Sequence, residues 1–341
     1  MIVYLICYAA SWIFARFGLY YLSGAALFLA AGYLYVYDYR RSGNLIHLRG
    51  LFSCFWVGGQ GAACLKLSKL QTDWALQTWI CFFLALVGFW ITFEVLDRLM
   101  GGNERFTMNR YRQRSTVRPL FFCIVGLTVI SAAAFVTEAA VLGFIPVLVR
   151  GVPHAYSAFH MTGLHYVTVS CVLIPAMTVL YFEQGGSRSG RKNGLIVLCT
   201  LVSIAIPILC VSRFQLVFAV ILAVFTFCAS QKNVSPWLFV AAVVALIPCY
   251  VLLTVARSHD VTYLNGIFEM KNAATPIFIT QPYMYIANNY DNFDCLVREL
   301  PAHSMGLKGM FPLWALSGLK FIKPALVDWP IYVNKEELTT V

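Results

Sequence analysis

The chain has 341 residues, of which 60% are hydrophobic and only 12% are charged, and its mean hydropathy is +0.73. A soluble domain carries about 25% charged residues, so this chain has roughly half the charge needed to cover a globule. Its repeated apolar runs, roughly 17–22 residues long, are long enough to cross a hydrocarbon core of about 30 Å. These features exclude a soluble enzyme, a secreted disulfide scaffold and a nucleic-acid-binding domain, and they predict an all-α polytopic membrane protein.

Successive apolar runs predict about nine transmembrane helices, of which the first and third are short. The runs lie near residues 2–15, 17–37, 51–64, 74–97, 119–137, 162–182, 194–211, 214–230 and 236–256. Residues 1–256 are therefore expected to form a transmembrane bundle. Residues 257–341 are expected to form one large extracytoplasmic segment.

The net charge of +10 comes mostly from short basic loops between the apolar runs. Such loops mark the cytoplasmic side of a membrane protein, which predicts a cytoplasmic N-terminus and an outer loop at 138–161. This distribution favours a topological signal over nucleic-acid binding. The basic residues concerned are Arg40, Arg41, Arg49, Arg98, Arg105, Arg110, Arg112, Arg114, Arg118, Arg188, Arg191 and Lys192.

The stretch 194–230 is too long for a single span. As one helix it would measure about 55 Å, at 1.5 Å per residue. It is therefore expected to form two spans that meet at Ser212 and Arg213. An arginine at the bilayer centre costs about 2.5–3.5 kcal/mol, so Arg213 is expected at the outer boundary.

The C-terminal segment, 257–341, mixes charges with many aromatic residues and prolines. This composition favours a folded loop near the membrane surface over disorder. Ten of the eleven cysteines lie in apolar runs, and the histidines lack metal-ligand spacing. We therefore predict no structural disulfide and no metal. The glycine-rich stretch 58–61 is expected to pack helices or to break the third span, rather than to bind phosphate.

Polar residues near the outer boundary are the candidates for chemistry. Arginine suits phosphate oxygens, asparagine and tyrosine suit sugars, and His259, Asp260 or Glu138 could serve as a general base. The candidate binding residues are Arg150, Arg213, Arg257, Arg298, Tyr285, Asn289, Asn292 and His303.

Each candidate also has a purely structural interpretation. A helix-end arginine often anchors at the interface, and Arg257 with Asp260 has the spacing of a surface ion pair. Glu138 is more often a structural carboxylate at a helix end. The histidines of the outer loop and the following span, His160 and His165 among them, are expected to be interface residues.

Several short motifs together resemble the Wzy-type polymerases of O-antigen and capsule oligosaccharide repeat units. They are Glu138 followed by Gly143-Phe144-Ile145-Pro146, Arg213 at the start of a span, and the stretch from Tyr285 to Asn292 followed by His303-Ser304-Met305-Gly306. The resemblance covers essentially the whole chain in hydropathy, although each motif is short and degenerate.

The resemblance implies an enzyme of the bacterial cytoplasmic membrane. Such enzymes use repeat units linked to undecaprenyl pyrophosphate at the outer face, without a metal or soluble cofactor. They transfer the growing glycan to a new lipid-linked unit. If the resemblance extends to the site residues, Arg213 and Arg257 would hold pyrophosphate and stabilise its developing charge. Arg298 would be a weaker contact, and a chain-length regulator is a candidate partner.

One departure concerns the C-terminus. Family members continue from the outer loop through a threonine-containing stretch into further spans, whereas this sequence ends at Thr339-Thr340-Val341. Two explanations stay open, a truncated protein or a missing last part.

Three other functions also stay open. A flippase for lipid-linked oligosaccharides would place cationic residues in a central cavity and show repeated spans, and no internal repeat is evident. A glycan ligase uses the same chemistry with another acceptor. A structural or regulatory subunit would tolerate alanine at both Arg213 and Arg257.

Overall fold

The computed structural model describes residues 1–99, 117–149, 155–230, part of 234–251, 265–299 and 308–324. Within these ranges the chain is helical, and its only β-type pairing is an isolated bridge between Ser68 and Met270. The helices are α1 (Ile2–Arg16), α2 (Tyr20–Ser42), α3 (Leu48–Cys64), α4 (Leu76–Leu99), α5 (Val117–Leu142), α6 (Ala155–Ala158), α7 (Leu164–Val169), α8 (Ile174–Glu183), α9 (Gly190–Leu209), α10 (Arg213–Ser230), α13 (Ile277–Glu299), α14 (Phe311–Leu316) and α15 (Leu319–Ile322), with short 3₁₀ turns η3 (Pro146–Leu148), η4 (Ser170–Leu173) and η5 (Lys308–Met310).

Five helical stretches in the described residues are long and apolar enough to cross a membrane. They are α4, α5, the continuous run from α7 to α8, α9 and α10. At most 33% of the most apolar window of each stretch is buried inside the protein. Most of their apolar side chains therefore face outward, where lipid can cover them. This supports an all-α, membrane-embedded protein.

The expected total of nine spans stays a prediction. Helices α1 and α3 have 15 and 17 residues, and 15 residues extend only about 23 Å along a helix axis. Helix α2 has 23 residues, but it includes six tyrosines and is less apolar. The expected ninth span, 236–256, lies mostly outside the described residues.

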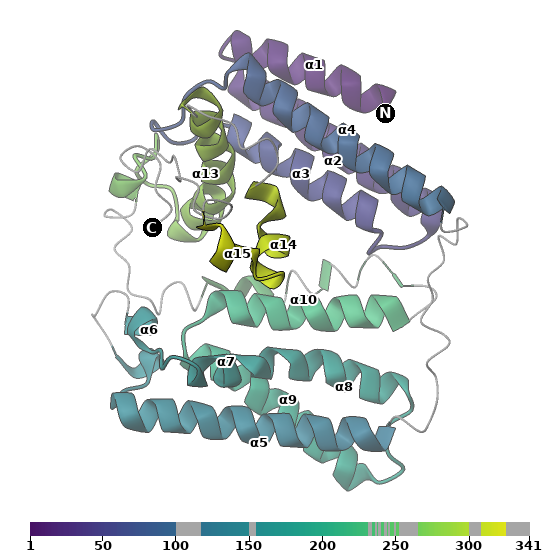
Figure 1. The fold of residues 1–341 in the computed structure, drawn as a ribbon, viewed down its shortest axis with the longest axis vertical. Coiled ribbons are helices and arrows are strands. Elements are labelled where there is room, and N and C mark those ends of the chain that lie inside the picture. The colour runs from purple at the N-terminus through teal and green to yellow at the C-terminus, as the bar shows by residue number, and fades with distance from the viewer. Residues whose placement is uncertain are drawn as a thin grey trace.

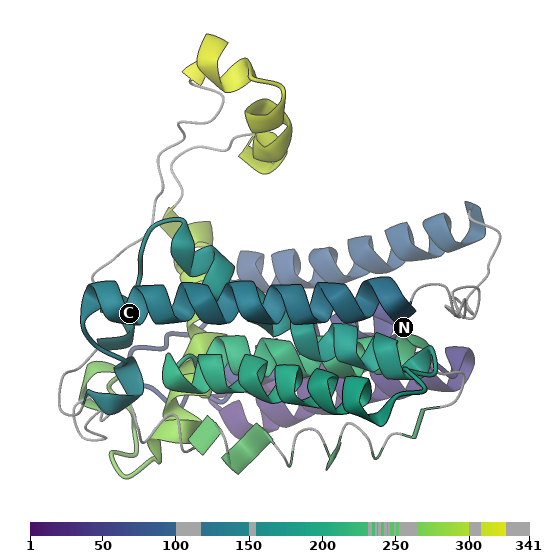
Figure 2. The ribbon, with the colours of Figure 1, turned by 90° about the horizontal axis from the view of Figure 1, so that it is seen from below.

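Figure 1 shows the helices in two groups, one above the other. The first, here called the N-terminal bundle, consists of α1–α4 and has a core that includes Leu34 and Leu86. The second bundle consists of α5 and α7–α10, around a core that includes Ile124 and Ile174. Helices α14 and α15 lie apart from both groups (Figure 2).

The glycines of α3 allow its neighbours to approach closely. A Cβ atom added to Gly24 of α2 would lie 2.8 Å from the carbonyl oxygen of Gly61. On another face of α3, a Cβ atom added to Gly59 would collide with the hydroxyl group of Tyr290 in α13. The prediction that residues 58–61 serve helix packing is therefore confirmed.

Helix α13 lies within the segment 257–341, which was expected to be a folded loop, and its 23 residues make it one of the longer helices. The extracytoplasmic location of this segment stays a prediction. Helix α13 packs mainly against α3 and α4 and crosses the ends of the N-terminal bundle (Figure 1). Its buried face is unusually polar for a helix. The sequence therefore lacks the apolar periodicity from which helices are predicted. The buried residues are Ile277, Thr280, Gln281, Tyr283, Met284, Ala287, Asn288, Asp291 and Asp294.

The two ends of the helix bundles differ in charge. Figure 1 places the α2–α3 connection, the end of α4, the start of α5 and the α8–α9 connection on one side. This side carries Arg40, Arg41, Arg98, Arg118, Arg188, Arg191 and Lys192, and it is called the basic end below. The α3–α4 connection, the end of α5 and the α9–α10 turn lie at the opposite end. The orientation of the basic end toward the cytoplasm stays a prediction.

Candidate functional site

The opposite end holds a carboxylate paired with a histidine. Glu138, one turn before the end of α5, is fully buried. Its carboxylate accepts hydrogen bonds from the Thr168 hydroxyl at 2.7 Å and from the backbone N–H of Met161 at 3.2 Å. Nδ1 of His165, in the first turn of α7, lies 3.2 Å from Glu138 Oε1. Three different donors thus converge on one buried carboxylate.

The two members of this pair differ in hydrogen-bonding capacity and in exposure. A carboxylate only accepts hydrogen bonds when ionised, so His165 must carry its proton on Nδ1 to bond Glu138. In the neutral ring, Nε2 then keeps its lone pair. The His165 side chain is 20% exposed, whereas that of Glu138 is completely buried. Of the two side chains, therefore, only that of His165 is accessible from outside the protein.

This assignment changes two expectations. Glu138 was a candidate base, but its burial and its three donors suit a positioning role. His165 was expected to be an interface residue, yet it holds the geometry of a general base. The ring of His160 lies close by, with its centroid 5.1 Å from that of His165. The sequence contains one weak signal of this site, the placement of His165 and Thr168 one helical turn apart.

Arg213 begins α10, as the length of the 194–230 stretch predicted. Its side chain is buried, with 6% exposure, and it donates a hydrogen bond at 2.5 Å to the Gln281 side chain of α13. Its guanidinium lies over the Tyr250 ring at 5.2 Å. Val211, two residues earlier, has a φ of 53°, a conformation that strains a β-branched residue. This tight turn directs Arg213 toward α13, so the contact joins the second bundle to the helix that packs against the N-terminal bundle.

The Arg213 turn and the Glu138–His165 pair belong to the same end of the second bundle. Cys210, which ends α9, belongs to the hydrophobic cluster that contains Phe135 and Phe159, with Ala139 packed against it. Phe135 and Ala139 flank Glu138 along α5. In Figure 1 the end of α5, helix α7 and the start of α10 also lie at this one end.

The other candidates are distributed differently. Tyr285 and Asn289 lie together on the exposed face of α13, where the Asn289 side chain donates to the Tyr285 carbonyl at 2.5 Å. Asn292 is half-buried. Arg298 pairs with Asp294 at 2.8 Å and also donates to a backbone carbonyl of the α3–α4 connection, which favours a structural role. Outside the described residues lie Arg150, Arg257, His259, Asp260 and His303.

A polar cluster that was not predicted from the sequence attaches α13 to the N-terminal bundle. The Asp291 carboxylate, with 2% of the residue exposed, pairs with Lys66 Nζ at 2.8 Å. It also accepts hydrogen bonds from the side chains of Gln71 and Trp74, both at 2.6 Å. Two hundred and twenty-five residues separate Lys66 from Asp291, so no local pattern could have revealed the pair.

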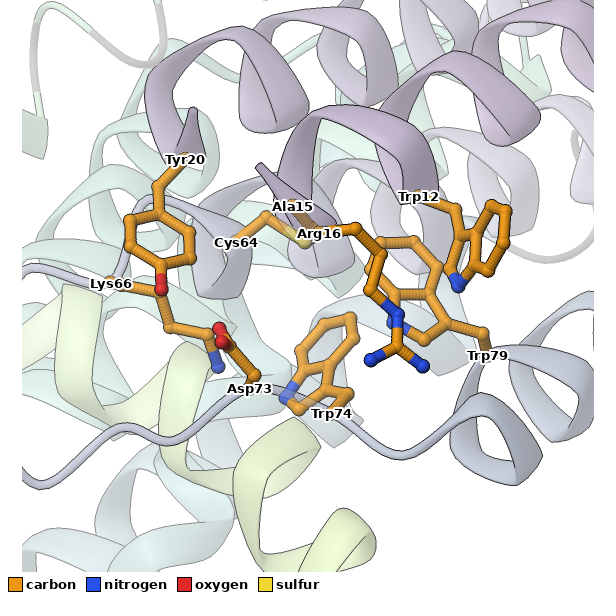
Figure 3. A pocket seen from close by; sticks show the side chains of 9 residues that line it. All are labelled: Trp12, Ala15, Arg16, Tyr20, Cys64, Lys66, Asp73, Trp74 and Trp79. Atoms are coloured by element: carbon orange, nitrogen blue, oxygen red, sulfur yellow. The ribbon is translucent and has the colours of Figure 1, made fainter. Parts of the chain in front are cut away.

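A narrow cavity lies beside this cluster (Figure 3). Its wall combines the side chains of Trp12, Trp74 and Trp79 with those of Arg16 and Lys66. Aromatic rings next to cations would suit a phosphorylated sugar. The cavity measures only about 20 Å³, however, which is room for about one water molecule. It is therefore too small to hold a sugar ring.

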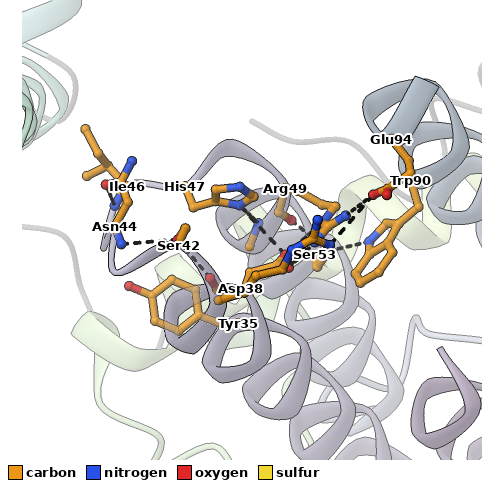
Figure 4. Close-up of polar contacts among 12 residues, drawn as sticks. Tyr35, Asp38, Ser42, Asn44, Ile46, His47, Arg49, Ser53, Trp90 and Glu94 are labelled. Carbon is orange, nitrogen blue, oxygen red and sulfur yellow. Dashed lines mark hydrogen bonds and ion pairs between the residues drawn. The ribbon is translucent and has the colours of Figure 1, made fainter. Parts of the chain in front are cut away.

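The basic end contains a buried charge cluster (Figure 4). Arg49, 3% exposed, pairs with Asp38 of α2 at 2.5 Å and with Glu94 of α4 at 2.9 Å. Its guanidinium also lies over the Trp90 ring at 4.4 Å. Arg49 was expected among the loop charges, but it lies in the first turn of α3 and ties three helices together. The cluster therefore stabilises the packing of α2, α3 and α4.

Comparison with known proteins does not identify a relative. No family model, curated protein or solved structure matches this chain.

Proposed function

We propose that this protein polymerises oligosaccharide repeat units carried on undecaprenyl pyrophosphate, at the outer face of a bacterial cytoplasmic membrane. The observation that carries the proposal is the Glu138–His165 pair, held at the same end of the second bundle as Arg213. This end lies opposite the basic loops, and loop charge assigns the basic loops to the cytoplasm. Acid–base chemistry placed there would act on the outer face.

In the proposed reaction, His165 acts as the general base. Its Nε2 accepts the proton of a hydroxyl group on the acceptor unit, and the hydroxyl oxygen attacks the anomeric carbon of the donor glycan. The bond between that carbon and the pyrophosphate oxygen breaks, and lipid pyrophosphate leaves with its electron pair. The proton then passes from the imidazolium to the leaving group or to water. Glu138 stabilises the imidazolium while it exists.

Arg213 is the proposed cation for the leaving group. A guanidinium matches the geometry of pyrophosphate oxygens and stabilises their developing charge. Its Nη1 donates a hydrogen bond to Gln281, which would fix the orientation of the side chain toward a bound pyrophosphate.

The test is the glycan profile of cells that lack the gene and carry one variant each. We expect His165→Asn to reduce polymerisation by about 10²–10⁴-fold, the usual contribution of a general base. Single repeat units should then replace the ladder at the cell surface. Tyr166→Phe is the matched control, because Tyr166 adjoins His165 in α7 but is 74% exposed.

The same experiment separates the alternatives. Repeat units trapped on the cytoplasmic side would indicate a flippase, and polymer retained on its lipid carrier would indicate a ligase. A normal ladder from stably inserted His165→Asn and Arg213→Ala variants would contradict the proposed roles. An unchanged profile in the deletion strain itself would favour a non-enzymatic membrane subunit.

A further inference from the structure

One face of α2 carries an exposed stripe that changes from apolar to basic along the helix. Leu29, Tyr33, Val36, Tyr37 and Arg40 follow each other at helical spacing and point to the same side. The first four are 42–70% exposed, and Arg40 is exposed as well. Neither bundle covers this face in the described part of the chain.

The basic end of the stripe is hollowed. Tyr33, Val36, Tyr37, Arg40 and Arg41, all from α2, line one side of an open space of about 420 Å³. The rings of Tyr33 and Tyr37 stack with their centroids 6.3 Å apart and form one wall. No hydrogen bond or ion pair to described residues engages the Arg40 guanidinium.

The second arginine is positioned by the charge cluster of Figure 4. Arg41 Nη1 lies 3.9 Å from Glu94 Oε2, and the same carboxylate oxygen pairs with Arg49. At this distance, and with the Arg41 side chain 42% exposed, the ion pair is weak. Arg41 is thereby held near the hollow while part of its guanidinium remains accessible.

The dimensions of the stripe match one leaflet of a bilayer. Eleven residues separate Leu29 from Arg40, which corresponds to about 16 Å along the helix axis. Half of a hydrocarbon core is about 15 Å thick. A lipid whose phosphate lies at Arg40 would therefore have its acyl chain beside Val36 and Leu29, with the tyrosines at the level of its glycerol.

We propose that this hollow is a binding site for an anionic phospholipid. The two guanidinium groups bind the phosphate diester, the tyrosine hydroxyls bond the glycerol ester oxygens, and the apolar part of the stripe contacts one acyl chain. Guanidinium groups suit phosphate oxygens, and anionic head groups bind basic pockets at the cytoplasmic side of membrane helices. A phosphatidylcholine head group would be disfavoured, because it would place its own cation beside two arginines. The site is independent of the glycan chemistry proposed above.

The test compares lipid retention by the purified full-length protein in detergent, measured by native mass spectrometry. The probes are phosphatidylglycerol and phosphatidylcholine with identical acyl chains. We expect the protein to retain phosphatidylglycerol preferentially. Each arginine near an anionic lipid contributes about fivefold in affinity, so the Arg40→Gln, Arg41→Gln double variant should bind phosphatidylglycerol roughly 25-fold more weakly.

A control pair separates a specific site from general charge attraction. Arg188 and Arg191 are exposed at the same basic end, and changing both to Gln removes the same charge. This variant should retain phosphatidylglycerol like the natural chain. Equal losses in both double variants, or no preference for phosphatidylglycerol in the natural chain, would overturn the proposal. So would full displacement of the lipid by millimolar inorganic phosphate, because the acyl contacts would then contribute nothing.

Discussion

Removing Arg49 should strongly destabilise the N-terminal bundle. Its guanidinium donates to both Asp38 oxygens through Nε, at 3.1 and 3.2 Å, and through Nη2 at 2.5 Å. Asp38 is 1% exposed, so Arg49→Ala would leave a buried carboxylate without its cation. Breaking a buried ion pair in this way costs about 3–5 kcal/mol.

The size of this destabilisation depends on how deeply the carboxylate is buried, and Glu94 in the same cluster tests that dependence. The Glu94 side chain is 32% exposed, so water can solvate it after the loss of a partner. Glu94→Gln should therefore cost only about 1 kcal/mol. Arg49→Met combined with Asp38→Asn removes both charges of the buried pair, and it should be less damaging than Arg49→Ala alone.

Thermal unfolding of the purified protein in detergent is the appropriate assay. At about 2 °C per kcal/mol for a large domain, Arg49→Ala should lower the melting temperature by about 6–10 °C, and Glu94→Gln by about 2 °C. Equal melting-temperature shifts for Arg49→Ala and Glu94→Gln would refute the argument that the burial of Asp38 sets the cost. If the Arg49→Met, Asp38→Asn double variant were less stable than Arg49→Ala, the ion pair would contribute more to stability than the neutralisation of the buried Asp38 charge.

Three further outcomes follow from the packing of α13 and from the acid–base pair. Gly59→Ala should destabilise the protein by about 1–3 kcal/mol, because the added methyl group collides with the Tyr290 hydroxyl; unchanged thermal stability would contradict this close approach. Lys66→Met should make α13 more susceptible to limited proteolysis, because it leaves the buried Asp291 carboxylate without its cation. Protection of α13 equal to that in the natural chain would contradict the role of this polar cluster in attaching the helix. Glu138→Gln should reduce the proposed transferase activity, because a neutral amide no longer offers two acceptor oxygens to Thr168, the Met161 N–H and His165; unaltered activity would remove the positioning role.

Local properties of the sequence account for the membrane-embedded, all-α class and for many helix boundaries. The apolar runs near 119–137 and 214–230 correspond to α5 and α10, because a span needs only a sufficient length of apolar residues. The turn at Ser212 and Arg213 followed from length alone. The position of the basic loops at one common end of the bundles followed from loop charge. None of these predictions requires knowledge of which helices touch.

The pairing of buried polar groups depended on the tertiary structure. Glu138 and His165 are 27 residues apart, and Lys66 and Asp291 are 225 apart, so their contacts arise only when separate helices pack. Such pairs also explain why α13 was not predicted as a helix: the carboxylates of Asp291 and Asp294 on its polar face are bonded in the interior by Lys66, Gln71, Trp74 and Thr78. Hydropathy records the cost of burying a polar group, whereas the compensating contact exists only in the folded chain.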